Sequence, residues 1–100
     1  MADSSFKASK CLTFSVIETE RKRLLNYCRA NKGLTLTINL EEVSLCDSAG
    51  LAFLIEFKRL ARKYKKQSNL EGMRESILAL AEFCGVADML ADEGRLAEGP

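Results

Sequence analysis

Residues 34–66 read LTLTINLEEVSLCDSAGLAFLIEFKRLARKYKK, and this stretch decides the fold. Its first seven residues alternate between an apolar and a polar face, with Leu34, Leu36, Ile38 and Leu40 against Thr35, Thr37 and Asn39. This period of two predicts a strand that is buried on one face, so helices are expected mainly on that face. Asp47 and Ser48 then precede an amphipathic helix predicted over 49–65.

The predicted helix has one apolar stripe at spacings of three and four residues, which indicates the face that packs on the sheet. The stripe contains Gly50, Phe53, Leu54, Phe57, Leu60, Ala61 and Tyr64. At about 100° per residue, Leu51 and Ile55 point about 120 to 160° away from the centre of the stripe, so we expect both to be exposed near Ser48. Two interpretations remain open. The last strand or the C-terminal turn covers these side chains, or they form the hydrophobic centre of a docking patch.

A basic run borders these two side chains and comprises Lys58, Arg59, Arg62, Lys63, Lys65 and Lys66. Such a run is more often a solvated helix face than a binding site. As a binding site it would favour an acidic partner or the anionic inner leaflet of a membrane. We assign Lys58 and Arg62 to the rim of the candidate docking patch.

The remaining blocks also alternate between strands and helices. They are a strand over 10–17, a helix over 18–31, a short strand over 67–70, a helix over 73–84 and a closing turn over 86–90. This order predicts one small α/β domain with a mixed β-sheet and helices mainly on one face. We expect the domain to span 10–91, between a flexible N-terminus over 1–9 and a flexible C-terminal tail over 92–100.

Composition limits the classes of protein that fit this chain. It has 100 residues, 47% of them hydrophobic, which is enough for one modest core. Its net charge of +1 is unlike the strongly basic balance of nucleic-acid-binding domains, so we expect no nucleic-acid partner. The longest apolar run, at 49–55, is far shorter than the ~20 residues of a membrane span, and the first residues lack a secretory signal. These features predict a cytoplasmic protein.

The residue types that usually carry catalysis are scarce. Histidine is absent, and the four cysteines, Cys11, Cys28, Cys46 and Cys84, are widely spaced without a Cys-x-x-Cys pair. The commonest general base and the usual metal-ligand spacing are therefore missing. We expect reduced, buried cysteines, no metal, no cofactor and no enzymatic activity.

The segment at Asp47 and Ser48 has two interpretations. Both residue types are good N-caps, and a cap alone is the simpler interpretation because capping residues are far commoner than functional sites. Alternatively, Ser48 is a candidate phosphoacceptor. A phosphate on its hydroxyl would lie against free amides at the positive end of the helix dipole, although Asp47 would repel it. Such a site would switch a surface on or off.

The alternating strand followed by Asp47-Ser48-Ala49-Gly50-Leu51-Ala52 resembles the STAS domain, the fold of anti-sigma factor antagonists and their relatives. The likeness covers about residues 11–90, and the last eleven of these, LAEFCGVADML, are similar to the family's last helix and closing turn. Within the family, the AGLAFLIE stretch over 49–56 most resembles the small cytoplasmic MlaB-type subunit of the Mla phospholipid-transport ABC system.

The resemblance implies a function. It implies a non-catalytic cytoplasmic accessory subunit that binds the ATPase of a bacterial phospholipid-transport ABC complex and supports its assembly and activity, reaching the inner membrane only through that partner. Ser48 matches the family's hydroxyl position, a phosphoacceptor in the antagonists, so the alternative is an anti-sigma factor antagonist controlled by phosphorylation of Ser48. Helix geometry and resemblance together give the candidate partner-binding residues Asp47, Ser48, Leu51, Ile55, Lys58 and Arg62.

Overall fold

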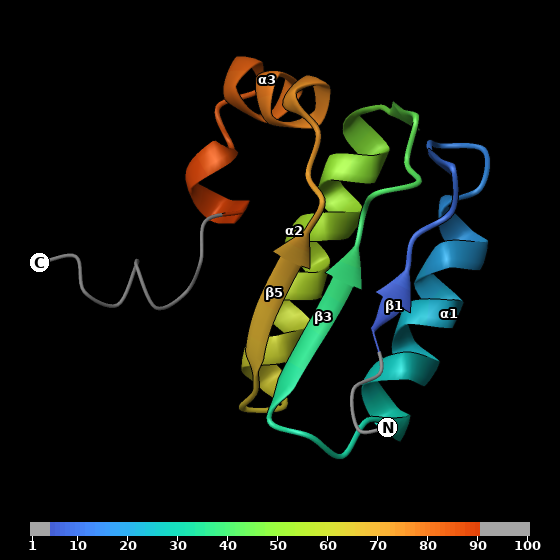
Figure 1. Ribbon diagram of the computed structural model, residues 1–100, viewed down its shortest axis with the longest axis vertical. Coiled ribbons are helices and arrows are strands. Elements are labelled where there is room, and N and C mark those ends of the chain that lie inside the picture. The colour runs from blue at the N-terminus through green and yellow to red at the C-terminus, as the bar shows by residue number, and fades with distance from the viewer. Residues whose placement is uncertain (1–4, 91–100) are drawn as a thin grey trace, which may run out of the picture.

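Strands and helices follow one another along residues 5–90, which the computed structural model describes. In chain order they are β1 (Phe6–Lys7), β2 (Cys11–Leu12), α1 (Ile17–Ala30), β3 (Thr35–Asn39), β4 (Leu45–Cys46), α2 (Ser48–Lys63), β5 (Gln67–Glu71), α3 (Glu75–Phe83) and the 3-10 helix η1 (Ala87–Leu90) (Figure 1). The predicted α/β class is confirmed. A helix follows the strand predicted over 34–40, and another follows the strand predicted over 67–70, as expected.

The sheet is parallel rather than mixed. β3 lies between β1 and β5, with Phe6 opposite Ile38 and Thr35 opposite Gln67. β2 pairs with β4 in a separate two-stranded sheet. Every strand pairing within residues 5–90 is parallel, so the expectation of a mixed sheet was wrong. The reason is that α1 returns the chain from β2 to β3, and α2 returns it from β4 to β5, so that paired strands run in the same direction.

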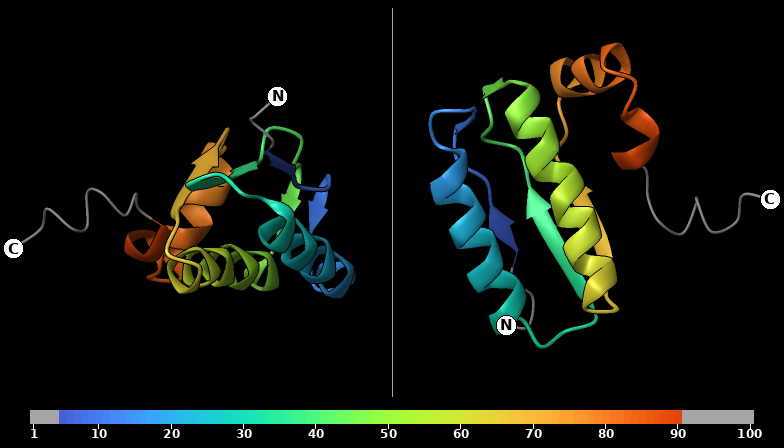
Figure 2. Two further views of the ribbon diagram at one scale, coloured as in Figure 1. Left: turned by 90° about the horizontal axis from the view of Figure 1, so that it is seen from below. Right: turned by 180° about the vertical axis from the view of Figure 1, so that it is seen from behind.

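Helices α1 and α2 cover one face of the sheet (Figure 2). The core between these layers contains Leu36 and Ile38 from β3 together with Phe53 and Phe57 from α2, none of them more than 1% exposed. The predicted helical stripe is confirmed, because its members are buried or partly buried against this core. The polar face of β3 lies on the other side of the sheet, as the alternation predicted.

The first predicted strand is much shorter than expected. Only Cys11 and Leu12 pair, after which the Val16 amide donates to the Thr13 carbonyl at 3.0 Å and closes a turn. Because the strand ends at Leu12, Phe14 projects outward and is 80% exposed. Leu34 is likewise 82% exposed, since β3 begins one residue after it.

The N-terminal boundary at residue 10 also needs correction. We placed residues 1–9 outside the domain, yet Phe6 and Ala8 belong to the core. Glu20 of α1, 2% exposed, accepts hydrogen bonds from the hydroxyl of Ser9 and a guanidinium nitrogen of Arg23, both at 2.7 Å. The Arg23 guanidinium also lies 4.6 Å from the centre of the Phe6 ring. These contacts hold residues 6–9 against α1. The tail predicted over 92–100 lies outside the described residues.

Within residues 5–90, none of the helices has the length and apolar character needed to cross a bilayer.

Candidate partner-binding site at the start of helix α2

Asp47 joins the start of α2 to the turn after β2. The amides of Ala49 and Gly50 donate to its Oδ1 at 3.0 and 3.1 Å, and the amide of Phe14 donates to its Oδ2 at 3.0 Å. These N–H donors favour the ionised carboxylate and lower the pKa of Asp47 below its ordinary value of 3.8, with the Phe14 amide as the largest cause. The capping interpretation is confirmed for Asp47, which also fixes the position of Phe14.

Gly50 lets α2 begin close to the sheet. A Cβ at this position would lie 2.2 Å from the Leu12 carbonyl oxygen and 2.7 Å from the sulfur of Cys46. Backbone atoms cannot yield by that amount, so only glycine allows this approach of helix to strand. The same close packing partly buries Cys46, and this desolvation together with the neighbouring Asp47 charge raises the pKa of Cys46 to about 11. This thiol is therefore a poor nucleophile near neutral pH.

Ser48 is the first residue of α2 and its side chain is exposed. The two amides that follow it are already bonded to Asp47, so they are not free to hold a phosphate on the Ser48 hydroxyl. The anion site that the sequence suggested is occupied by the protein's own carboxylate. A phosphate at Ser48 would instead extend into solvent and add charge to the surface.

Two predicted site residues, Leu51 and Lys58, lie inside the protein. Leu51 is 3% exposed and belongs to the core cluster that also contains Ile77 of α3, and Lys58 is 5% exposed. The prediction that both are accessible was wrong, and for Leu51 the other interpretation holds, in which C-terminal elements cover this side of α2. Helices α3 and η1 also pack against α2. Residues 51 and 58 are two turns apart, so they point to the same side of the helix.

The other predicted residues are accessible to different degrees. Ser48 and Arg62 are exposed, and Asp47 and Ile55 are partly buried. Ile55 lies on the outward side of α2 with Ser48, since residues 48, 52, 55 and 59 fall within about 60° of one another around the helix. Arg62 is near the other end of the helix, about 20 Å from Ser48 along its axis, so the two do not form one compact site.

Two large apolar side chains beside Ser48 were not predicted. Phe14 is held next to Asp47 by its amide, and Leu45, two residues before Asp47, is 59% exposed. Leu45 also lines a groove of about 270 Å³ between β4 and α3, whose walls include Ile77 and Leu80. The alternation over 10–17 placed Phe14 on the buried face of a strand, and no sequence signal marked Leu45 as exposed.

A second groove runs along the outward side of α2 toward η1. It measures about 630 Å³ and is lined by Ala52, Ile55, Glu56, Arg59, Leu60, Lys63, Val86 and Met89. Met89, 48% exposed, forms its η1 wall. We call the surface made by Phe14, Leu45, Ser48, Ala52 and Ile55 the α2 face. It has apolar side chains around a single hydroxyl, which is the composition of a protein-binding surface.

The fold defines the class of protein. The structure is similar to that of the anti-sigma factor antagonist SpoIIAA in its unphosphorylated form, with a TM-score of 0.66 and 16% sequence identity over 92% of this chain and 83% of that chain. At this identity the likeness shows the fold alone, a small α/β domain.

The sequence comparison is more specific. Residues 12–91 match the family model described as "Mlab, STAS domain", so the chain belongs to the Mlab-type STAS domain family, as the resemblance predicted. None of the curated proteins matches the chain.

The Asp47 carboxylate gives the site a testable pH dependence. Its pKa is lowered on folding, so its contribution to stability is present above pH 3.8 and is lost as the pH falls through the folded pKa. We expect Asp47→Asn to be less stable than the wild type in urea unfolding at neutral pH. The gap should shrink as the pH is lowered toward about 3. A gap of constant size over this range would show that the charge of Asp47 does not stabilise the cap.

Proposed function

We propose that this chain is a non-catalytic accessory subunit that binds the ATPase of a bacterial phospholipid-transport ABC complex and supports its assembly and activity. Membership of the Mlab-type STAS family supports this proposal, because the sequence resembles the MlaB-type subunit of such a complex. The observation that carries it is the α2 face, where Ser48 is exposed at the start of α2 and follows Asp47, whose carboxylate caps the helix and holds the amide of the exposed Phe14. On this proposal the protein acts in the cytoplasm and reaches the inner membrane through its partner.

The α2 face suits binding better than catalysis. Both oxygens of the Asp47 carboxylate are held by amides, and the Cys46 thiol has a raised pKa and is packed against Gly50. Neither group is available to a substrate as a base or nucleophile. In contrast, Phe14 and Leu45 together offer aromatic and aliphatic area that loses water when a partner covers it. Ser48 would be desolvated at the centre of that contact.

Co-purification with the ATPase tests the proposal. The chain, tagged and expressed with the ABC ATPase encoded in the same gene cluster, should recover that ATPase. We expect Ser48→Glu to weaken the complex by at least tenfold, because a carboxylate would be desolvated without a partner. Thr19→Glu is the matched control, since Thr19 is exposed in the first turn of α1, and it should bind like the wild type.

Two outcomes would contradict this assignment. If Ser48→Glu bound the ATPase as tightly as Thr19→Glu, the α2 face would not be the interface. If the wild type recovered no ATPase but a serine kinase instead, and if phosphorylation of Ser48 released that kinase, the chain would be an anti-sigma factor antagonist. The exposed Ser48 hydroxyl is the observation that keeps this second function open.

A further inference from the structure

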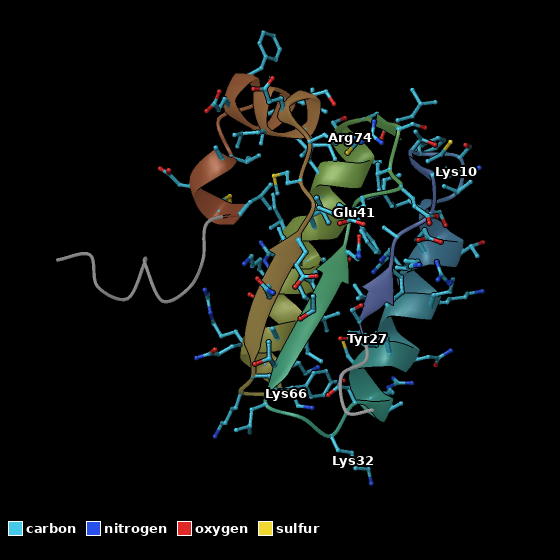
Figure 3. All side chains as sticks on the ribbon, viewed as in Figure 1. Lys10, Tyr27, Lys32, Glu41, Lys66 and Arg74 are labelled. Atoms are coloured by element: carbon cyan, nitrogen blue, oxygen red, sulfur yellow. The ribbon has the colours of Figure 1, made fainter. Side chains whose placement is uncertain are left out.

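Among residues 5–90, the charged side chains at one end of the domain are all positive. Helices α1 and α2 both end there, and β3 and β5 both begin there (Figures 1 and 3). The stretches that build this end, residues 24–40 and 57–70, contain no Asp or Glu. The exposed cations of these stretches are Arg29, Lys32, Arg59, Arg62, Lys63 and Lys65. Four of them, Arg29, Lys32, Lys63 and Lys65, take part in none of the ion pairs formed within residues 5–90. We call this region the basic end.

Hydrogen bonds hold the loop after α1 and the loop after α2 side by side. The Gln67 amide donates to the Leu34 carbonyl at 3.0 Å, and the Lys66 ammonium donates to the Asn31 carbonyl. Figure 3 shows Lys32 and Lys66 at this same end. The cations of the two loops therefore form one surface rather than two separate ones.

Lys65 occupies a position where glycine is the usual residue. Its φ is 60°, and the Lys66 amide donates to the Ala61 carbonyl at 2.8 Å, which closes α2 with a left-handed C-terminal cap. A residue with a Cβ is disfavoured in this conformation. A lysine at this strained position points to a function for its charge.

An exposed leucine accompanies these cations. Leu34 is 82% exposed and directly precedes β3, within the 31–34 loop that also holds Lys32. A nucleic acid or an acidic peptide would gain little from a lone aliphatic side chain. Binding to a bilayer surface would be strengthened by both the leucine and the cations. The leucine enters the headgroup region, while the cations face anionic lipids. Lysines act as point charges suited to such a diffuse surface, and three of the six exposed cations are lysines.

We infer that the basic end of this domain binds the surface of an anionic phospholipid bilayer, with Leu34 entering the headgroup region. The opposite end, where β3 and β5 finish, carries Glu41, Glu42 and Glu71 beside Lys10 and Arg74 (Figure 3), so it lacks the uniform positive charge of the basic end and the charge distribution orients the domain on such a surface. Ser48 is about 24 Å from the basic end along α2, so the α2 face stays free for a protein partner. The inference does not depend on the proposed function, and it adds a direct lipid contact to the attachment through the partner.

Vesicle binding by the isolated chain tests this inference. Vesicles of phosphatidylcholine alone are compared with vesicles that contain about a third phosphatidylglycerol, at low and high salt. Each cation near an anionic surface strengthens partitioning about fivefold, so Lys63→Gln with Lys65→Gln should weaken binding about 25-fold. Leu34→Ser should weaken it about tenfold. The matched control is Lys10→Gln with Lys22→Gln, which removes the same charge elsewhere and should change binding less than about threefold.

The result expected is binding to anionic vesicles alone, weakened by high salt and by the variants of the basic end. An absence of binding at low salt would overturn the inference. Equal losses of vesicle binding in the two double variants would also overturn the inference, because binding would then depend on net charge only. If a labelled RNA or DNA oligonucleotide bound more tightly than the vesicles and lost affinity in the Lys63 and Lys65 variant, the basic end would be a nucleic-acid site instead.

Discussion

Replacing Leu51 with aspartate should unfold the domain, even though the sequence suggested an exposed position. Leu51 is 3% exposed among core residues, so the variant removes buried apolar area and places a charged carboxylate inside the hydrophobic core. We expect a loss of more than about 4 kcal/mol in the free energy of unfolding, comparable with the whole stability of many small domains. Urea unfolding followed by circular dichroism measures this change.

Ala52 supplies the matched control, because it is the next residue of the same helix and is exposed. Ala52→Asp should cost less than about 1 kcal/mol, mostly through the lower helix propensity of aspartate. It should still weaken binding to the ATPase, since residue 52 belongs to the α2 face. If Leu51→Asp were as stable as Ala52→Asp, the packing of α3 and η1 over this side of α2 would be wrong.

Replacing Phe57 with alanine should be the other large effect. Phe57 is fully buried in the middle of the α2 stripe and is among the largest buried side chains. We expect a loss of about 3–5 kcal/mol, the usual range for truncating a core phenylalanine. The same unfolding measurement applies, and the variant should keep its helical spectrum under native conditions if the domain remains folded.

Phe83 provides the same substitution at an exposed position, since it is 88% exposed at the end of α3. Phe83→Ala should change the free energy of unfolding by less than about 0.5 kcal/mol. Equal effects of the two variants would mean that α2 does not present its Phe57 side to the sheet.

The fold was largely predictable because its strongest signals are local. The alternation over 34–40 predicted β3 and its buried face, and the spacing of Phe53 and Phe57 predicted the side of α2 that packs on the sheet. Asp47 was recognisable as a cap from residue type alone. Each of these inferences needs only the geometry of one element.

The site was less predictable because it depends on contacts between elements. Whether Leu51 is exposed depends on where α3 and η1 lie, which no periodicity within α2 reveals. Phe14 follows the alternation of its segment, and only the early end of β2 turns it outward. Phe6 was missed because a two-residue strand has no period to detect, and its place in the core depends on the distant strand β3.

The parallel pairing also shapes how the chain reaches its native state. Phe6 pairs with Ile38 and Thr35 pairs with Gln67, so each main pairing joins segments about thirty residues apart. These strands cannot pair progressively outward from a tight hairpin. The chain must first close a long loop, which is slow. In each case the loop contains a helix that forms quickly and shortens the distance to be closed. During synthesis, β1 has no partner until β3 has left the ribosome, so the start of the domain is assembled well after it is made.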